Sequence, residues 1–392
     1  MNIIFLLNSP YPYYTGGRET WLYNVSQRLC RRHQVYIIVE KWNSTKSNFG
    51  RFSEIDPRIH FLYASDLRDI PAFSPFLRSY VTWLNEEIML YSMRRQLKLL
   101  LTSKVGEKSC VISMDTVYTG KIGVWVKRNF PETIYICSVR GIHADDRGER
   151  YPLLNGYFHR VEHKTLATAD QIWSNGWDTQ ENLRTLGFSS VVMRNGVETS
   201  RAEHSLPVPP QMLSPDATYH VLTIGTLQDG KGYVELIRAI AYLKKKYNVL
   251  VGLTAFGKGN PARYETLAWQ EGVESQLCFA GVQPQTVEYA QSFNLVACLS
   301  DGSGLSMACL ESLISGTPVI AWDSPVYRQM IIHRESGYLV EEKNVVALAE
   351  GILWMMQHGE EAKQMGLKAQ KFARNFDWSY IVQSIEEQLQ GC

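Results

Sequence analysis

The sequence predicts an α/β protein of two doubly wound domains, each built on a parallel sheet that helices cover on both faces. Short apolar runs without polar alternation recur between longer segments of helical period, as in parallel strands that are buried on both faces. A Pro-rich stretch at residues 205–210 interrupts this pattern, which then begins again. The length of 392 residues also suits two hydrophobic cores better than one.

The expected strands form two sets, one on each side of the Pro-rich stretch. The first set covers residues 3–7, 34–39, 59–62, 110–113, 134–138, 171–174 and 190–193. The second set covers residues 219–224, 250–256, 276–279, 295–299 and 318–321. Sheets of this class bind ligands outside the carboxyl ends of their strands. We therefore expect a ligand site in a cleft between the two domains.

The composition excludes a disordered chain and favours a reducing compartment. The chain is 45% hydrophobic and has 21 Tyr, 14 Phe and 10 Trp, enough apolar surface to offset the entropy of ordering. Its seven cysteines include no Cys-x-x-Cys pair, so we expect reduced and mostly buried thiols. The first residues carry no charged leader, and the sequence has no apolar run of about 18 residues. We therefore expect a cytoplasmic protein.

The charge is divided unevenly along the chain. Through Val197 there are 25 basic and 18 acidic residues, against 15 basic and 21 acidic residues afterwards. The positive half could face phosphates or an anionic membrane, although an unevenly charged solvated surface remains the alternative. Residues 76–101 form a long predicted helix that mixes apolar and basic side chains. We favour packing in the first domain over a peripheral membrane contact, which sedimentation with anionic vesicles would test.

Two glycine-containing loops follow predicted strands and open helices. Gly16 and Gly17 follow the first strand, where paired glycines let backbone N–H groups approach a phosphate or a sugar. Residues 225–232 match the spacing of a P-loop, but Gly232 follows Lys231 where a P-loop has Ser or Thr to hold magnesium. Magnesium-dependent ATP binding stays open as an alternative. Lys231 is kept in either case as a phosphate-binding cation.

Three other known site patterns are absent from the sequence or incomplete. The glycines at 302 and 304 lack the third glycine of a nicotinamide fingerprint, so a dehydrogenase is disfavoured. No Asp-x-Asp triplet is present to chelate a metal on a diphosphate, which leaves Lys231 and helix N-termini to meet that charge. His159 and His163 have metal-ligand spacing, but a solvated helical face is favoured because no third ligand is evident.

Two further residues have candidate roles in the predicted cleft. His143 follows a predicted strand and so lies on the cleft side, where a functional and a structural role are both open. Glu311 lies inside an otherwise apolar helix, and a carboxylate there needs a partner. The vicinal hydroxyl groups of a ligand would satisfy it, as ribose does in dinucleotide sites.

With these residues the chain resembles the family 4 retaining glycosyltransferases of GT-B architecture over nearly its whole length. The landmarks occur in the family's order. They are Gly16-Gly17, His143, Ala169-Asp170 followed by Ile172-Trp173-Ser174, Asn195-Gly196-Val197, Gly225 with Lys231-Gly232, Gly257-Lys258-Gly259, Glu311 with Gly316-Thr317-Pro318-Val319, Ser336-Gly337-Tyr338-Leu339-Val340 and Phe376-Asp377-Trp378.

The resemblance implies two Rossmann-like domains that face a central cleft. Residues 1–200 would bind the acceptor, residues 211–376 would bind the nucleotide sugar, and a terminal helix at 377–392 would cross back to the first domain. The expected substrates are a UDP or GDP sugar and a glycan or lipid-linked acceptor, with no metal, no cofactor and no nucleic acid. The catalytic residues would be His143 on the transferred sugar, Lys231 on the diphosphate and Glu311 on the ribose. The implied donor-binding set is Gly16, Gly17, Thr226, Lys231, Gly257, Val282, Ser303, Gly304, Leu305, Ser306 and Glu311.

Two positions depart from the family pattern. Ser303 stands where the family commonly has the first carboxylate of a Glu-x7-Glu pair, with Asp301 close by as a substitute. Thr226 stands where the family often has an arginine after the strand glycine, which leaves Lys231 with less help. The alternative to an active transferase is therefore a non-catalytic, glycosyltransferase-like subunit that binds a glycan or supports a partner enzyme.

Overall fold

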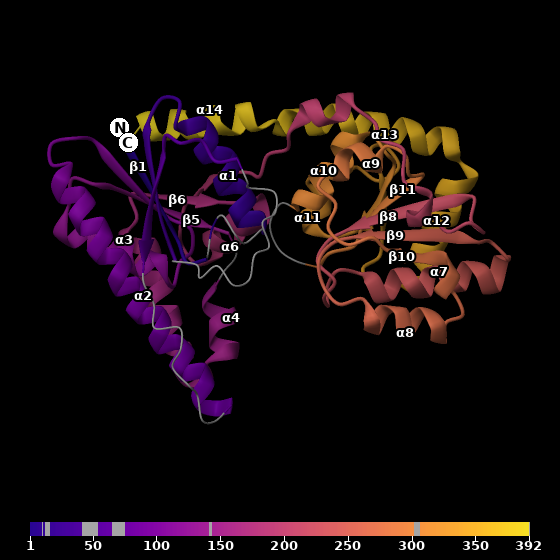
Figure 1. Ribbon diagram of the computed structural model, residues 1–392, viewed down its shortest axis with the longest axis horizontal. Coiled ribbons are helices and arrows are strands. Elements are labelled where there is room, and N and C mark those ends of the chain that lie inside the picture. Colours follow the sequence, from indigo (N-terminus) through magenta and orange to yellow (C-terminus); the bar gives the residue numbers. More distant parts are fainter. Residues whose placement is uncertain are drawn as a thin grey trace. The chain divides into compact units, whose positions relative to one another are not determined.

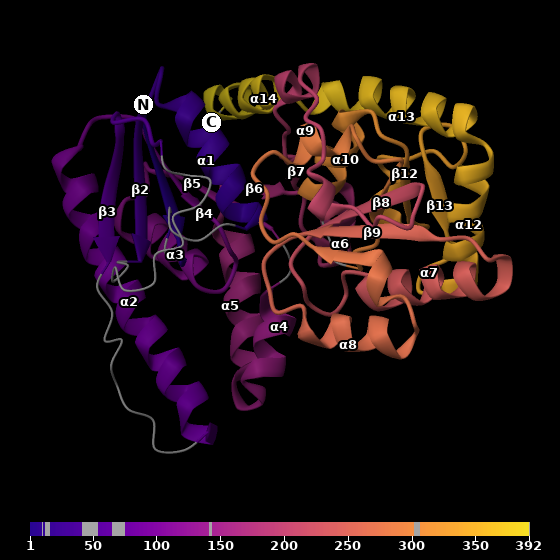
Figure 2. The same cartoon turned by 45° about the vertical axis from the view of Figure 1, so that its right-hand side comes forward.

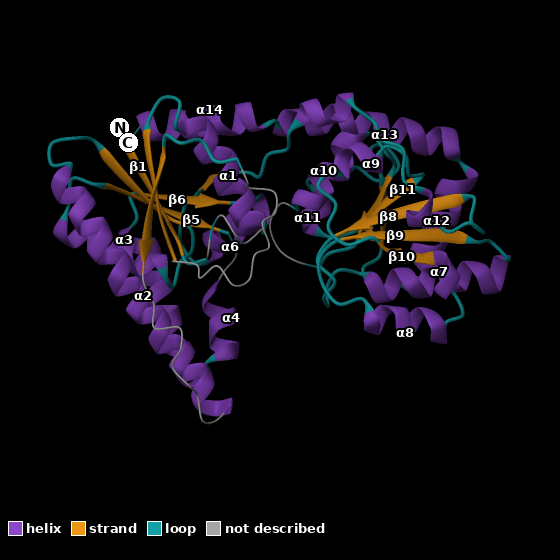
Figure 3. Ribbon diagram, viewed as in Figure 1, coloured by secondary structure: helices purple, strands orange, loops and turns teal. Residues whose placement is uncertain are grey.

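The computed structural model describes residues 1–9, 11, 16–40, 54–64, 75–140, 143–301 and 306–391, with the side chains of 75–82, 143 and 146 excepted. The chain divides into two compact units, Met1–Arg194 with Ile381–Cys392 and Asn195–Tyr380. Each unit is built on one parallel sheet with helices around it (Figure 3). The predicted fold class is therefore confirmed.

The first unit contains a seven-stranded sheet in the order β3-β2-β1-β4-β5-β6-β7. Neighbouring strands are parallel throughout, so their carboxyl ends lie along one edge of the sheet. The strands are β1 (Asn2–Leu7), β2 (Gln34–Glu40), β3 (Ile59–Ala64), β4 (Ser109–Ser113), β5 (Ile134–Val139), β6 (Gln171–Ser174) and β7 (Val191–Val192). The helices are α1 (Gly17–Leu29), α2 (Pro75–Ser103), α3 (Thr119–Asn129), α4 (His143–Arg150), α5 (Asn155–Thr168) and α6 (Trp177–Thr185) (Figure 1).

Strand β1 shows why the expected strands lack polar alternation. Ile4 and Leu6 belong to a core cluster that they share with residues of α2, α3 and α5. Phe5 points to the opposite face, where its ring meets that of Trp21 in α1 edge to face at 6.3 Å. Because helices cover both faces, all six residues of β1 are buried, and each of them except Asn2 is apolar.

The second unit contains a six-stranded parallel sheet in the order β10-β9-β8-β11-β12-β13. Its strands are β8 (Tyr219–Ile224), β9 (Val251–Phe256), β10 (Leu277–Phe279), β11 (Leu295–Cys298), β12 (Val319–Trp322) and β13 (Tyr338–Val340). Helices α7 (Tyr233–Tyr247) and α8 (Ala262–Gln270) lie on one face, and α9 (Thr286–Ala290), α10 (Met307–Ser315) and α13 (Gly359–Ala373) lie on the other (Figure 2). The remaining helices are α11 (Pro325–Arg328), α12 (Val345–Gln357), which packs on α7, and α14 (Trp378–Gln390).

Helix α2 is the long helix that the sequence predicts at 76–101. Met89, Met93 and Leu97 are buried in the core of the first unit, which confirms the favoured interpretation of a packing helix. The exposed side of α2 carries Tyr91 and Leu99, and contact of this side with a membrane stays a prediction. No helix within the described residues is both long enough and apolar enough to span a bilayer.

The Pro-rich stretch at 205–210 belongs to the second unit, because the chain divides at Asn195. Backbone contacts hold this stretch: the Leu206 N–H donates to the Glu288 carbonyl at 3.1 Å. Helix α14 begins in the second unit, and from Ile381 onwards it belongs to the first, where Glu386 pairs with Arg32 at 2.8 Å.

None of the described cysteines forms a disulfide bond. All are buried except Cys278, which is half-buried, as expected from the apolar stretches that they interrupt. Cys392 lies outside the described residues. A reducing compartment stays a prediction.

Candidate functional site

The candidate site of the second unit lies where the order of its sheet reverses. The chain moves from β8 outwards to β9 and β10, and then returns to place β11 on the other side of β8. Ligands of doubly wound sheets bind at this point, outside the carboxyl ends of the two strands. The loops there are residues 225–232 after β8 and the residues that follow β11, of which Leu299, Ser300 and Asp301 are described.

Lys231 connects these two loops. Its Nζ donates a hydrogen bond to Ser300 Oγ at 2.8 Å, and the Asp301 N–H donates to the Gly230 carbonyl at 3.0 Å. Burial lowers the pKa of Lys231 below its usual value, and the negative charge of Asp301 opposes this shift. A half-buried ammonium group is thus placed between the ends of β8 and β11, where its charge is screened less than in water.

The glycines on either side of Lys231 are required by close packing. Both have positive φ, 74° at Gly230 and 72° at Gly232. A Cβ at Gly232 would lie 2.2 Å from Leu299 Cβ and 2.8 Å from the Leu299 carbonyl oxygen. The position that carries the magnesium-binding hydroxyl in a P-loop therefore has no room for a side chain here. This packing argues against the ATP-binding alternative.

Gly257 brings together the loops that follow β8, β9 and β10. A Cβ at Gly257 would lie 1.7 Å from the Gly225 carbonyl oxygen, and the Gly257 N–H donates to the Gly281 carbonyl at 2.8 Å. Thr226 and Val282 are the next residues of those two loops, and Val282 is 69% exposed. Three residues predicted to bind the donor thus lie along one edge of the second sheet.

Glu311 is buried in α10, and its partners come from the protein itself. Thr286 Oγ1 donates to Glu311 Oε2 at 2.9 Å, and Arg201 Nη1 lies 3.8 Å from Glu311 Oε1. The need of this carboxylate for a partner is thus met at least in part within the protein. The role of Glu311 at the ribose stays a prediction.

Arg201 is a residue that sequence reasoning missed. It lies in the short helix η2 (Thr199–Glu203) and donates to Glu288 through Nε at 2.9 Å and Nη2 at 2.6 Å. Together with the contact to Glu311, one guanidinium group lies between two largely buried carboxylates. The available clue was that a glutamate inside an apolar helix needs a partner, but no local pattern shows which residue supplies it.

The remaining predicted site residues are described to different extents, and for His143 only the backbone is described. Ser303, Gly304 and Leu305 lie outside them. Ser306 is the N-cap of α10 and accepts a hydrogen bond from the Cys309 N–H at 3.3 Å. In the first unit Gly16 is the N-cap of α1 and Gly17 its first residue, while the backbone of His143 begins α4.

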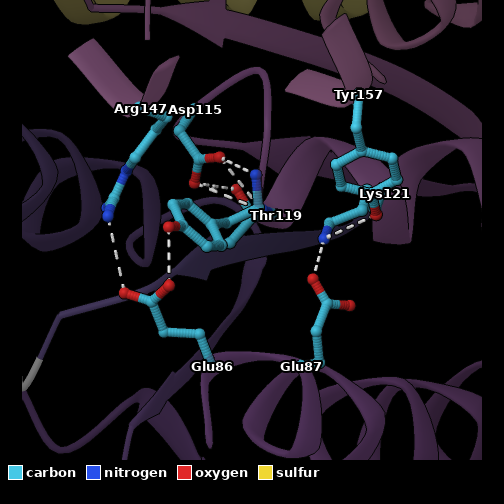
Figure 4. Close-up of polar contacts among 8 residues, drawn as sticks. Glu86, Glu87, Asp115, Thr119, Lys121, Arg147 and Tyr157 are labelled. Atoms are coloured by element: carbon cyan, nitrogen blue, oxygen red, sulfur yellow. Dashed lines mark hydrogen bonds and ion pairs between the residues drawn. The ribbon is translucent and has the colours of Figure 1, made fainter. Parts of the chain in front are cut away.

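A polar cluster anchors α4, which carries His143, to α2 and α3 (Figure 4). Tyr118 OH donates to Glu86 Oε2 at 2.6 Å, and Arg147 Nη1 lies 3.5 Å from Glu86 Oε1. The guanidinium carbon of Arg147 also lies 4.2 Å from the centre of the Tyr118 ring. Burial raises the pKa of Glu86, and the contacts with Tyr118 and Arg147 oppose this shift. Arg147 thus holds α4 one turn after its start.

The same view shows four contacts beside the cluster, two made by Asp115 and two by Lys121 (Figure 4). The carboxylate of Asp115 accepts hydrogen bonds from Thr119 N at 3.1 Å and Thr119 Oγ1 at 2.6 Å at the start of α3. Lys121 pairs with Glu87 of α2 and donates to Tyr157 OH of α5 at 3.4 Å. These bonds fix α3 and α5 relative to α2.

The two histidines with metal-ligand spacing have separate partners. His159 lies 3.3 Å from Asp145, whereas the ring of His163 packs edge to face on Phe188 at 5.2 Å. In the part of the chain that is described, no three His, Cys, Asp or Glu side chains gather as metal ligands would. Both histidines are exposed, as in the solvated helical face that the sequence favours.

Comparison with known proteins finds a family match within the second unit. Residues 209–372 match the family described as Glycosyl transferases group 1, so the second unit carries the sequence pattern of group 1 glycosyltransferases. A curated relative, the D-inositol 3-phosphate glycosyltransferase of Corynebacterium glutamicum, is 27% identical over 190 residues, which are 46% of this chain and 44% of that protein. The chain spans about half the length of the curated relatives that it matches.

Similar solved structures cover both units. Sucrose-phosphate synthase of Thermosynechococcus elongatus matches with a TM-score of 0.78 at 16% identity, over 100% of this chain and 98% of that one. HepE of Anabaena, in complex with UDP and glucose, matches with a TM-score of 0.75 at 18% identity over 100% of both chains. The chain therefore has the GT-B fold that the sequence predicts.

Proposed function

We propose that this protein is a retaining family 4 glycosyltransferase that moves a hexose from a nucleoside diphosphate sugar to a hydroxyl group of a glycan or lipid-linked acceptor. Such a reaction would serve polysaccharide or glycoconjugate biosynthesis. The observation that carries the proposal is Lys231, a half-buried cation at the switch point of the unit that matches group 1 glycosyltransferases. UDP and GDP are the proposed donor nucleotides.

Lys231 has the chemistry that the departing diphosphate needs. In the proposed step the bond between the anomeric carbon and the diphosphate oxygen breaks while the acceptor oxygen bonds to the same face of the sugar. The acceptor proton passes to the departing diphosphate. A fixed cation in a partly dry site stabilises the negative charge that develops on this leaving group. Glu311 is engaged by Arg201 and Thr286, so it suits a binding role better than that of a nucleophile.

The proposal also assigns each substrate to one unit and states what the reaction requires and where it takes place. The first unit would bind the acceptor and the second unit the donor. The reaction would need neither a metal nor a cofactor, and it would take place in the cytoplasm, with peripheral contact to the membrane. The alternative, a non-catalytic subunit that binds a glycan, draws its support from Ser303 and Thr226.

A thermal-shift panel tests the proposal. UDP, GDP, ADP and their common sugar conjugates are compared in EDTA, with ATP plus magnesium measured separately. A ligand at about a hundred times its dissociation constant stabilises the folded state by about 2.7 kcal/mol. We expect one nucleoside diphosphate to stabilise the protein without metal. No stabilisation by any nucleotide would favour the non-catalytic alternative, and a shift with ATP and magnesium alone would favour the P-loop.

A further inference from the structure

We propose that Lys343 is a second cation for the diphosphate of the donor, beside Lys231. That the anion is a donor diphosphate rests on the proposed function. That Lys343 belongs to the candidate site of the second unit rests on its contact with Asp301.

Lys343 lies in the short loop between β13 and α12, at the carboxyl edge of the second sheet. Strand β12 lies between β13 and β11, so these two strands are about 10 Å apart. The side chain of Lys343 reaches across this separation, since its Nζ lies 3.6 Å from Oδ2 of Asp301 in the loop that follows β11. A third loop thus contacts the switch point at which the candidate site lies.

The loop holds Lys343 in an uncommon backbone conformation. Its φ is 60°, in the left-handed region that few residues other than glycine, asparagine and aspartate adopt. Asn344 fixes the loop, because its side chain accepts from the Ala347 N–H at 3.0 Å and donates to Glu341 Oε2 at 2.8 Å. Residues held in this region cost free energy and cluster at functional sites, which makes this lysine a candidate for function.

Asp301 links Lys343 to the loop that carries Lys231. The Asp301 N–H donates to the Gly230 carbonyl at 3.0 Å, and Asp301 Oδ1 lies 2.2 Å from where a Cβ of Gly230 would be. Lys231 Nζ donates to Oγ of the preceding residue, Ser300, at 2.8 Å. The two ammonium groups therefore contact neighbouring residues of one segment.

Lys343 can exchange its contact with Asp301 for an anionic ligand. The side chain of Lys343 is 65% exposed, and 3.6 Å is longer than a hydrogen bond. An exposed ion pair of this kind contributes little to stability, because water and salt screen it. The ammonium group sits on a flexible stem, and a diphosphate carries more negative charge than one carboxylate.

A second cation at this place answers a need of the donor site. Within residues 225–232, the loop that follows β8, Lys231 is the only basic residue, and the uncharged Thr226 stands where the resemblance implies an arginine. Lys343 brings a positive charge from a different loop. Cations fixed beside the departing diphosphate stabilise the charge that develops on it.

Binding of inorganic pyrophosphate in EDTA tests the proposal, since this probe has two phosphates and neither base nor sugar. Calorimetry measures its dissociation constant. We expect Lys343→Met to weaken binding by about three- to tenfold, less than the loss of a buried charge-assisted contact, because Lys343 is mostly exposed. The matched control is Lys246→Met, since Lys246 Nζ also lies 3.6 Å from a carboxylate, that of Glu350, and its removal should leave binding unchanged.

Lys343→Gly keeps the test valid if the methionine variant does not fold. Glycine adopts a positive φ without strain, so this variant should unfold at a temperature close to that of the wild type. It should bind pyrophosphate as weakly as Lys343→Met.

Asp301→Asn separates a binding role of Lys343 from a purely structural one. This variant breaks the same ion pair, but it also removes a negative charge beside the lysines, so it should bind pyrophosphate at least as tightly as the wild type. The proposal is overturned if both Lys343 variants bind as the wild type does. It is also overturned if Asp301→Asn loses as much affinity as Lys343→Met.

Failure of the proposed function gives a different result. Pyrophosphate that binds through Lys343 while no nucleoside diphosphate stabilises the protein supports the anion-binding role and contradicts the proposed function alone. A nucleoside diphosphate that binds the wild type and Lys343→Met equally well contradicts the role of Lys343 alone. A wild-type protein that binds neither pyrophosphate nor a nucleoside diphosphate would overturn both.

Discussion

Replacement of Lys231 by alanine is expected to lower the kcat of sugar transfer by about 100- to 1000-fold, the cost of removing one preorganised donor from a developing negative charge. Lys231 is the cation between the ends of β8 and β11. The position on the same loop where the family often has an arginine carries the uncharged Thr226. The effect should be larger on kcat than on KM, because the charge of the diphosphate increases as the bond to the sugar breaks. Release of nucleoside diphosphate from the donor measures both constants.

Two further variants make this result specific. Lys246→Ala removes an exposed lysine of α7 that pairs with Glu350 at 3.6 Å, and it should leave kcat unchanged. Lys231→Arg keeps the positive charge and should retain part of the activity. A Lys231→Ala protein that is folded and transfers sugar at the wild-type rate would show that Lys231 does not meet the diphosphate.

Replacement of Arg201 by methionine is expected to destabilise the folded protein by about 3–5 kcal/mol, the usual cost of breaking a buried ion pair from one side. The change leaves Glu288 and Glu311, both largely buried, without the guanidinium group that lies between them. Two like charges in a poorly hydrated place would then lose the cation that they share. Urea unfolding followed by tryptophan fluorescence measures the change.

The matched control is Arg184→Met, which removes an exposed ion pair with Glu181 and should change the free energy of unfolding little. Adding Glu288→Gln to Arg201→Met should restore part of the lost stability, because one of the two carboxylates is then neutral. If Arg201→Met unfolds at the same urea concentration as the wild type, the cluster does not hold Glu311 in place.

The strands of the fold could be predicted because both faces of each sheet are covered. Residues such as Ile4, Phe5 and Leu6 are buried in turn on opposite faces, so the strand appears in the sequence as one apolar run. Strand β13 contains Tyr338, Leu339 and Val340 and was not among the expected strands. Its shortness does not explain this, since β7 and β10 are no longer and were expected.

The candidate site could be predicted only where local sequence determines the geometry. The position of Lys231 follows from the strand before it and from two glycines whose positive φ shapes the loop. The partner of Glu311 could not be found in this way. Arg201 reaches Glu311 because η2 packs against α9 and α10. The two residues are about 110 positions apart, and no local pattern in the sequence indicates this contact.

Amide hydrogen exchange tests the central claim most directly, because it shows where a nucleotide binds without changing the protein. The exchange is measured with and without the nucleoside diphosphate that gives the largest thermal shift. We expect slower exchange in peptides that cover residues 225–232 and 306–311 of the second unit. If the exchange rates of these two segments do not change while the nucleotide is bound, the assignment of Lys231 and Glu311 to the donor site is contradicted.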